Sequence, residues 1–354
     1  MNVCIVGDGL VSLTLAKALV NQGIQVDLIV DKKTNKIDKS RTIGISKANV
    51  GFFNQYILNI KKILWDINQI EIYTDNLKNE KILNFEKNDA ALFSITENYK
   101  LYNVLLSSLK KNILFKKKFD QKKIFSKNYK LILNCDQSNS IAKKYFSKNF
   151  FKNYNSYAYT SIIEHSKIAN NTAVQIFTKK GPLAFLPVSN IKTSVVYSIR
   201  GENKIKFEDL IKKYNLRYSN IKIEKISSFK LSSKNLRNYY HKNILAFGDS
   251  LHKLHPLAGQ GFNMSIRDIQ SLLKLVKKKI SLGLDLDSSI CKDFEKKMKH
   301  KNFLFSNGID LIYELFKFES RIDNSFLSKS IQFVGKKKFA NNFFTKYADR
   351  GIDL

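Results

Sequence analysis

The chain has 354 residues, a length that suggests two interleaved domains. Of these residues 44% are hydrophobic and 12% aromatic, a composition that excludes a disordered protein. Its formal net charge is +31, yet only seven of its 61 basic residues are Arg, and the Lys residues are spread along the whole chain. Because base recognition and phosphate clamping favour Arg, we expect no nucleic-acid partner, whereas a basic surface resting on anionic lipid is compatible with this pattern.

The three cysteines, Cys4, Cys135 and Cys291, are odd in number and far apart. Their spacing indicates neither a disulfide framework nor a metal site and suits a reducing compartment. No apolar run reaches the roughly 18 residues of a membrane-spanning helix, and a strand pattern begins at Asn2, where a signal peptide would otherwise lie. We therefore expect a cytoplasmic protein, with at most a peripheral contact on the inner face of a membrane.

The first thirty residues predict a strand, a glycine loop, a helix and a second strand. The apolar run 3–6 is typical of a buried parallel strand, residues 11–22 form an apolar helix, and 26–30 is the second strand. Between strand and helix lies the pattern Gly7-x-Gly9-x-x-Ser12. The first glycine permits a tight turn, the second lets a pyrophosphate approach the backbone, and the third position must be small, a role that Ser12 fills less comfortably than Gly. The pattern predicts a dinucleotide-binding fingerprint; the alternative is an ordinary strand-to-helix turn.

The acidic residue that holds a ribose in such folds is less clear in this chain. Val30 falls at the usual position, and Asp31 follows one residue later. Asp31 reaches the ribose hydroxyls if the strand ends slightly early; otherwise it is a solvated loop carboxylate.

The following segments predict a mixed α/β region and then a sheet. A short segment at 41–45, apolar after its Arg, precedes a helix that extends to about 57. Paired strands are expected at 69–74 and 81–85, a helix at 97–110, and a buried strand at 131–135. From about residue 156, segments of strand length follow one another at 157–164, 173–178, 182–188 and 194–200, which predicts an antiparallel sheet. A strand at 244–247 precedes a helical pattern that begins near Asn263, and 286–354 is expected to be mostly helical.

The segment from Gly248 to Asn263 is the richest in chemistry. Asp249 follows a short strand, and the carboxyl ends of parallel strands are where α/β sheets bind ligands, so its carboxylate can accept hydrogen bonds from sugar-alcohol hydroxyls. Gly259 and Gly261 let the backbone approach a flat ring, and the helix near Asn263 directs its positive end toward that ring.

His252 and His255 lie three residues apart in this segment, which is compatible with a zinc site. A proline follows the pair, however, and no Cys or acid supplies a third ligand in register. We therefore expect no metal and assign both imidazoles to packing and hydrogen bonding within the loop.

With these motifs in place, the chain resembles the flavin-dependent aromatic hydroxylases, and more narrowly the ubiquinone-biosynthesis hydroxylases. The segment LAFGDSLHKLHPLAGQGFNMSIRD (245–268) is similar to their GD…HPxxGQGxN region. The segments RTIGIS (41–46), EN (97–98) and FTKKGPLAFLP (177–187) agree with further family segments in the same order. The resemblance covers roughly residues 1–280.

The resemblance implies a Rossmann-like FAD-binding domain, an interleaved antiparallel-sheet substrate domain and C-terminal helices. The corresponding boundaries are 1–68, 96–155 and 240–285 for the first, 69–95 and 156–239 for the second, and 286–354 for the helices. Carried over by position, the residues that bind FAD are Gly7, Gly9, Ser12, Asp31, Arg41, Asp249, Pro256, Gly259, Gln260, Gly261 and Asn263.

The implied reaction is hydroxylation of the aromatic ring of a polyprenyl phenol by O2, through a C4a-hydroperoxide of the flavin, with NAD(P)H or another electron donor. The implied partners are the membrane surface and other quinone-biosynthesis proteins. One departure is Asp136-Gln137, where the family has Asp-Gly, and this puts direct handling of NAD(P)H in doubt. The sequence names no catalytic residue. Hydroxylation of a soluble aromatic compound, reduction of a prenyl group and a non-catalytic flavin-binding scaffold stay open as alternatives.

Overall fold

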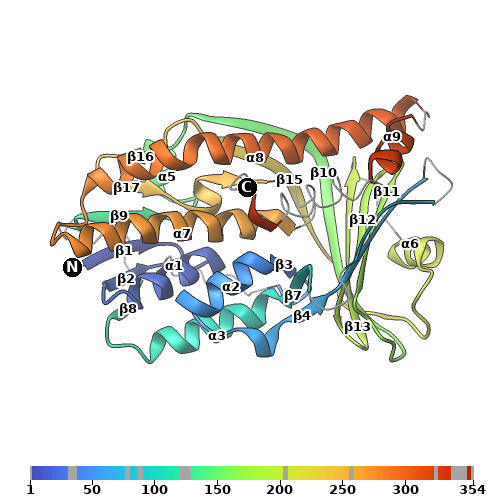
Figure 1. The fold of residues 1–354 in the computed structure, drawn as a ribbon, viewed down its shortest axis with the longest axis horizontal. Coiled ribbons are helices and arrows are strands. Elements are labelled where there is room, and N and C mark those ends of the chain that lie inside the picture. The colour runs from blue at the N-terminus through green and yellow to red at the C-terminus, as the bar shows by residue number, and fades with distance from the viewer. Residues whose placement is uncertain are drawn as a thin grey trace.

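The structure is a computed structural model of the whole chain, and it describes residues 2–30, 38–75, 80–86, 91–119, 129–201, 206–254, 259–322, 326–335 and 349–351. Figure 1 shows a layered α/β part beside a large twisted sheet, with one long helix running along both.

A six-stranded sheet forms the centre of the α/β part, in the order β16-β17-β9-β1-β2-β8. Its strands are β1 (Asn2–Val6), β2 (Gln25–Ile29), β8 (Phe115–Lys118), β9 (Leu131–Asn134), β16 (Tyr240–His241) and β17 (Ile244–Ala246). All neighbours are parallel except β16 and β17. The apolar runs of β1 and β9 are buried, as expected for central parallel strands, and the predicted strand–helix–strand opening is confirmed to within one or two residues.

Helices pack against this sheet and contribute apolar side chains to its hydrophobic core. They are α1 (Leu10–Val20), α2 (Lys47–Tyr56), α3 (Asn98–Lys110), α5 (Ser140–Tyr145) and α7 (Gln260–Ser281), with the short 3-10 turns η1 (Lys61–Ile63) and η3 (Gly248–Ser250). α1 and α7 run side by side, and both N-terminal ends are directed toward the large sheet (Figure 1). α7 begins at Gln260, three residues before the predicted start near Asn263, because Gly259 takes a left-handed conformation and acts as its N-cap.

The large sheet has the order β18-β15-β10-β13-β12-β11-β5-β6, with β14 paired to β10. Its strands are β5 (Gln69–Thr74), β6 (Lys81–Glu86), β10 (Asn149–Glu164), β11 (Thr172–Thr178), β12 (Gly181–Ser189), β13 (Lys192–Arg200), β14 (Lys222–Ile223), β15 (Ser227–Leu236) and β18 (His252–Lys253). The predicted pairing of 69–74 with 81–85 is confirmed. The predicted antiparallel sheet of the segments between 157 and 200 is confirmed, and β5 extends it as a parallel neighbour of β11.

Strand β10 begins eight residues earlier than predicted. Its first half, which is largely exposed, pairs with the end of β15, and the register shifts between Asn153 and Ser156, where Asn155 has a positive φ of 49°. The predicted domain boundary at 155/156 therefore falls inside one continuous strand that serves both parts of the molecule.

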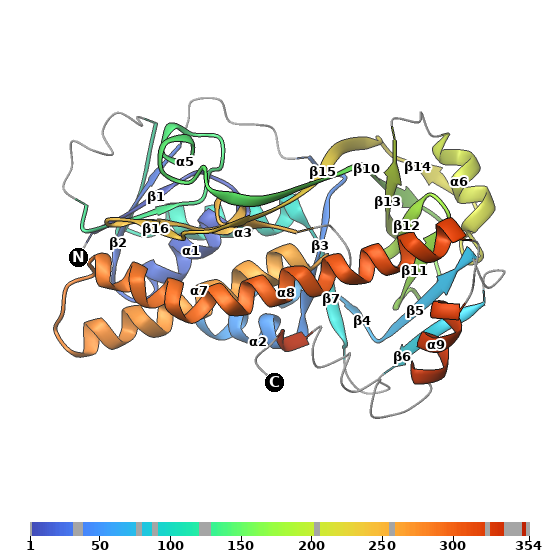
Figure 2. The ribbon, with the colours of Figure 1, turned by 90° about the horizontal axis from the view of Figure 1, so that it is seen from above.

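A three-stranded sheet joins the two parts, formed by β3 (Thr42–Ser46), β7 (Phe93–Glu97) and β4 (Trp65–Ile67). Three further helices lie on the large sheet: α6 (Phe207–Tyr214), α8 (Ser288–Ile322) and α9 (Phe326–Gly335). α6 and α8 lie on different sides of the sheet (Figure 2). α6 packs on one face, and Phe305 and Ile309 of α8 contact Phe177 on the other. Among the described residues, none of the helices combines the length and the apolar character needed to cross a membrane.

Candidate functional site

The glycine loop after β1 is shaped by conformation and by close packing. Gly7 has a φ of +107°, and a Cβ atom at this position would lie 3.2 Å from the Cβ of Asp136. Gly9 is the N-cap of α1, and a Cβ there would meet nothing within 4 Å. In this described part of the chain, no side chain caps α1 and no acidic residue lies in its first turn. The N–H groups of that turn are therefore available to an anion, as the fingerprint predicts.

Ser12, the third position of the fingerprint, is buried and accommodated despite its hydroxyl. The hydroxyl is hydrogen-bonded to the thiol of Cys135, the residue that follows β9. Burial raises the pKa of this thiol to about 12, and the nearby carboxylates of Asp249 and Asp136 act in the same direction. Cys135 therefore stays protonated at neutral pH and serves as a packing partner of Ser12 rather than as a nucleophile.

Three parallel strands end at the same edge of the six-stranded sheet, directly beside the glycine loop. The N–H of Cys135 donates to the carbonyl of Val6 at 2.9 Å, and the N–H of Phe247 donates to the carbonyl of Asn134 at 2.8 Å. The turns that follow β1, β9 and β17 are thus aligned. This is the position at which α/β sheets bind their ligands.

Asn134, which was not predicted as a site residue, holds two of these turns together. Its side-chain amide donates to the carbonyl of Asp136 at 3.0 Å and to the hydroxyl of Ser250 at 3.2 Å. Its side-chain oxygen accepts a hydrogen bond of 2.7 Å from Asn139, the N-cap of α5. The available signal was a lone amide at the end of the apolar strand LILN.

The turn that carries Asp249 packs against the start of α1. Gly248 has a φ of +55°, and a Cβ atom there would lie 2.9 Å from Cγ1 of Val11, so only glycine fits without displacement. Asp249 follows in the η3 turn, and its side chain is exposed. The structure therefore places this carboxylate beside the glycine loop, at the surface and accessible to hydroxyl groups.

The first turn of α7 forms the second half of the site. The side chain of the buried Asn263 accepts hydrogen bonds of 2.9 Å from the N–H of Ser46 and from the amide of Asn49, and it donates to the carbonyl of Gly44 at 2.9 Å. The side-chain oxygen of Gln260 is buried and accepts no hydrogen bond from the described residues. No side chain within the described stretch caps α7, as is also the case for α1.

Not all of the other residues predicted to bind FAD lie at these turns. Arg41 is exposed, and its guanidinium lies over the ring of Phe229, 4.8 Å from the centroid, so it faces the large sheet. Asp31, Pro256 and His255 lie outside the described residues. Gln137, the departure from the family pattern, is not among the described residues with positive φ, so its backbone needs no glycine.

His252 belongs to a buried network that the sequence did not predict. Its Nε2 is hydrogen-bonded to the carboxylate of Asp268 on α7, and that carboxylate also accepts a 3.0 Å hydrogen bond from Asn302 on α8. The network ties β18 to two helices. Within the described ranges, no group of His, Cys, Asp or Glu side chains has the arrangement of a metal site.

An apolar cluster lies between the start of α7, strand β11 and α8. Its buried members are Phe177, Leu254, Met264, Phe305 and Ile309. Phe316 of α8 stacks on Phe177, with ring centroids 3.7 Å apart. This cluster forms an apolar wall next to the N-terminal end of α7.

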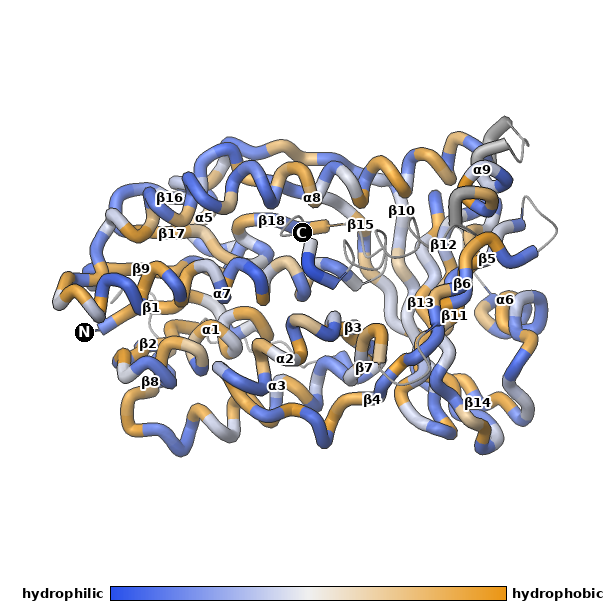
Figure 3. The backbone as a smooth tube through the Cα atoms, in the orientation of Figure 1, coloured by the Kyte–Doolittle hydropathy of each residue, from blue (hydrophilic) through white to orange (hydrophobic). Residues whose placement is uncertain are grey.

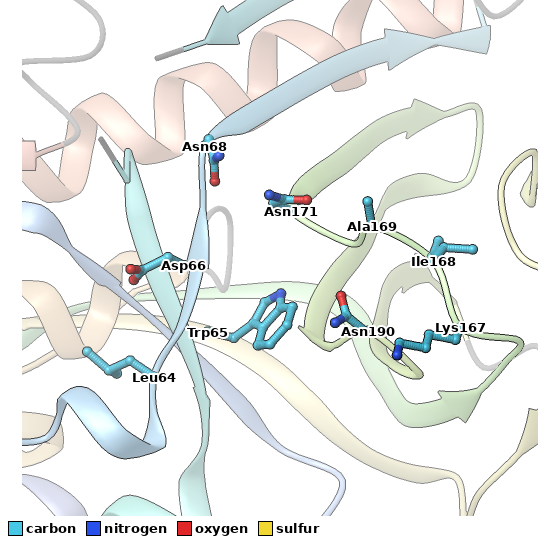
Figure 4. Close-up of a pocket in the computed structure, with 9 residues that line it drawn as sticks. All are labelled: Leu64, Trp65, Asp66, Asn68, Lys167, Ile168, Ala169, Asn171 and Asn190. Atoms are coloured by element: carbon cyan, nitrogen blue, oxygen red, sulfur yellow. The ribbon is translucent and has the colours of Figure 1, made fainter. Parts of the chain in front are cut away.

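A separate surface hollow of about 750 Å³ lies between β4 and the loops that flank β11 and β13 (Figure 4). The indole of Trp65 in this hollow donates to the carbonyl of Asn170 at 2.7 Å. None of its lining residues belongs to the turns described above, so it is no part of the dinucleotide site.

Comparisons with known proteins agree with this arrangement. The family described as "FAD binding domain" matches residues 198–281. The ubiquinone biosynthesis monooxygenase COQ6 of Dictyostelium discoideum is 24% identical over 89% of this chain and 84% of its own length. Its counterpart in Schizosaccharomyces pombe is 23% identical over 99% of this chain and 92% of its own length.

Among solved structures, the p-nitrophenol 4-monooxygenase PnpA of Pseudomonas putida superimposes with a TM-score of 0.75 at 12% identity, covering 99% of this chain and 98% of that one. This similarity confirms the predicted fold class. Together with the paired helix N-termini and the aligned turns, the comparisons show that residues 198–281 match an FAD-binding domain and that the whole chain is similar to ubiquinone biosynthesis monooxygenases.

Proposed function

We propose that this enzyme hydroxylates the aromatic ring of a polyprenyl phenol in ubiquinone biosynthesis. The observation that carries the proposal is the similarity to ubiquinone biosynthesis monooxygenases over 89% and 99% of the chain, rather than over the cofactor domain alone. The apolar cluster of Phe177 and its neighbours supports it, because a prenylated ring requires an apolar chamber beside the flavin.

The residues present fit FAD. The uncapped first turn of α1, with Gly7, Gly9 and Ser12, would hold the pyrophosphate, and the exposed Asp249 would accept hydrogen bonds from the ribityl hydroxyls. The backbone of Gly259, Gln260 and Gly261 would contact the flavin ring.

Bound FAD supplies the redox chemistry with O2, and the chain supplies the environment. The uncapped N-terminal end of α7 stabilises negative charge on a group placed before it. Phe177, Met264 and Phe305 exclude water from the neighbouring volume and offer an apolar surface to the ring. The electron donor in this proposal is NAD(P)H or another reductant, because Gln137 leaves the choice open.

The test is quinone profiling by mass spectrometry of cells that lack the protein. We expect a prenylated phenol that lacks one ring hydroxyl to accumulate, and the wild-type gene to restore the profile. An Asp249→Ala variant should restore it poorly if bound FAD is needed. An unchanged quinone profile would contradict the proposed substrate, whereas full restoration by a flavin-free variant would favour a scaffold. Purified enzyme that consumes O2 only with a soluble phenol would assign it to the soluble-aromatic hydroxylases.

A further inference from the structure

The outer face of α8 carries a line of exposed apolar side chains, here called the outer stripe. It consists of Leu304, Leu311, Leu315 and Phe318, which are 57%, 60%, 37% and 63% exposed. Their spacings of seven, four and three residues place them on one face of the helix. α8 runs along the outside of the molecule in Figure 2, and apolar and polar bands alternate along it in Figure 3.

Aromatic side chains widen the stripe toward β10. Phe303 is exposed and contacts the ring of Phe150, with centroids 5.8 Å apart. Phe150 is itself half exposed, and the guanidinium of Arg237 lies over its ring. Exposed apolar patches of this extent are uncommon on monomeric proteins and mark interaction surfaces.

The half of α8 that precedes the stripe is positively charged. The first half of α8 presents the exposed Lys292, Lys296 and Lys297, with Asp293 as the exposed acid among them. One carboxylate beside the stripe already forms two ion pairs. Glu314 is bonded to Lys152 at 3.1 Å and to Lys317 at 2.8 Å.

We propose that the outer stripe and the Lys-rich half of α8 dock the enzyme on the surface of an anionic lipid bilayer. Apolar side chains that project from one helix face can enter the headgroup boundary, while the lysines contact anionic headgroups. A second copy of the chain would also carry +31 charges and would be repelled. Phe305 and Phe316 of α8 lie outside the stripe, because Phe305 is buried and Phe316 stacks on Phe177.

The opposite face of the same helix contributes Phe305 and Ile309 to the apolar cluster beside α7. A docked α8 would therefore separate this cluster from the lipid by about 10 Å, the diameter of one helix. A prenyl tail could pass that short distance. This consequence rests on the proposed function, whereas the docking itself does not.

The test is flotation of the full-length holoenzyme with vesicles of phosphatidylcholine, with or without phosphatidylglycerol. We expect binding only to the anionic vesicles, weakened by salt. Leu311→Gln combined with Leu315→Gln should lower the partition coefficient roughly tenfold or more. The matched control is Leu216→Gln, because Leu216 is 83% exposed and follows α6 on the other face of the large sheet. This control should bind as the wild type does.

Lys296→Gln combined with Lys297→Gln should reduce binding at low salt, whereas the exposed pair Lys61→Gln and Lys62→Gln on η1 should not. Circular dichroism and the flavin spectrum verify that each variant is folded. Absence of binding to anionic vesicles, or equal binding by the stripe and control variants, would overturn the proposal. So would sedimentation showing that the stripe joins two copies of the chain. The vesicles contain no quinone, so these outcomes are independent of the substrate.

Discussion

The side chain of Asn263 accepts a 2.9 Å hydrogen bond from the N–H of Ser46, although the two residues lie 217 positions apart. The same oxygen accepts from Asn49 on α2, and the amide group donates to Gly44 on β3. One buried amide thus fixes the start of α7 against two other elements. Since that helix start belongs to the proposed flavin site, we expect Asn263 to link the stability of the fold to cofactor binding.

We therefore expect Asn263→Ala to lower the free energy of unfolding by about 1–3 kcal/mol, because it leaves buried donors and acceptors without partners. It should also weaken FAD binding. Urea denaturation and titration of the apoprotein with FAD measure the two effects. The control is Asn103→Ala on α3, which replaces an exposed amide and should change stability by less than about 0.5 kcal/mol. Equal stability and equal FAD affinity of the two variants would refute this role of Asn263.

Gly7→Ala should abolish tight FAD binding. A φ of +107° is unfavourable for any residue with a Cβ atom, and that atom would press on Asp136. Gly51→Ala on α2 is the matched control, because a Cβ there meets nothing within 4 Å and Ala favours the helix by about 0.5–1 kcal/mol. Flavin content after purification measures the difference, and a yellow Gly7→Ala protein with normal affinity would contradict this assignment.

The sequence predicts the turns of this site well because glycines and terminal polar residues follow short apolar strands. Gly7, Gly248 and Gly259 each have a positive φ, which few other residue types adopt. A glycine at each of these positions therefore indicates the backbone conformation. The alignment of the turns follows from parallel pairing of β1, β9 and β17, which alternation of strands and helices already indicates.

The hydrogen bonds between His252, Asp268 and Asn302 could not be predicted, because they depend on tertiary contacts between distant segments. Asp268 and His252 are 16 residues apart, and Asn302 is 34 residues beyond Asp268. Nothing local distinguishes these polar residues from solvated ones. The early start of β10 could not be predicted for a related reason, since its first half is largely exposed and is held by pairing with β15.

Asp249→Ala should weaken FAD binding about tenfold or more, since a hydrogen bond to a charged group contributes about 1.5–3 kcal/mol. Asp31→Ala should have a smaller effect, because Asp31 follows the usual ribose position by one residue. Asp293→Ala, which removes an exposed carboxylate on α8, is the control and should bind FAD normally. Titration of the three apoproteins decides the order, and a larger loss for Asp31→Ala would reverse the ranking.

The start of α8 depends on Asp287, whose carboxylate accepts hydrogen bonds from the hydroxyl of Ser289 at 2.6 Å and from its N–H at 3.2 Å. The Ser289 hydroxyl, and beyond it Lys279, holds the pKa of Asp287 below its ordinary value of 3.8. A carboxylate with a lowered pKa stabilises the fold above its unfolded-state pKa, and the contribution is lost as the pH falls through the folded-state pKa.

Asp287→Ala should therefore lower the free energy of unfolding at pH 7 by about 0.5–2 kcal/mol, the usual effect of removing an N-terminal helix cap. The difference from wild type should shrink once the pH falls below 3.8, because the native carboxyl then becomes protonated as well. Asp285→Ala breaks only an exposed ion pair with Lys130 and should change stability little at either pH. Urea denaturation at several pH values measures both variants. A loss for Asp287→Ala that stays constant down to acid pH would show that the charge of this carboxylate does not stabilise α8.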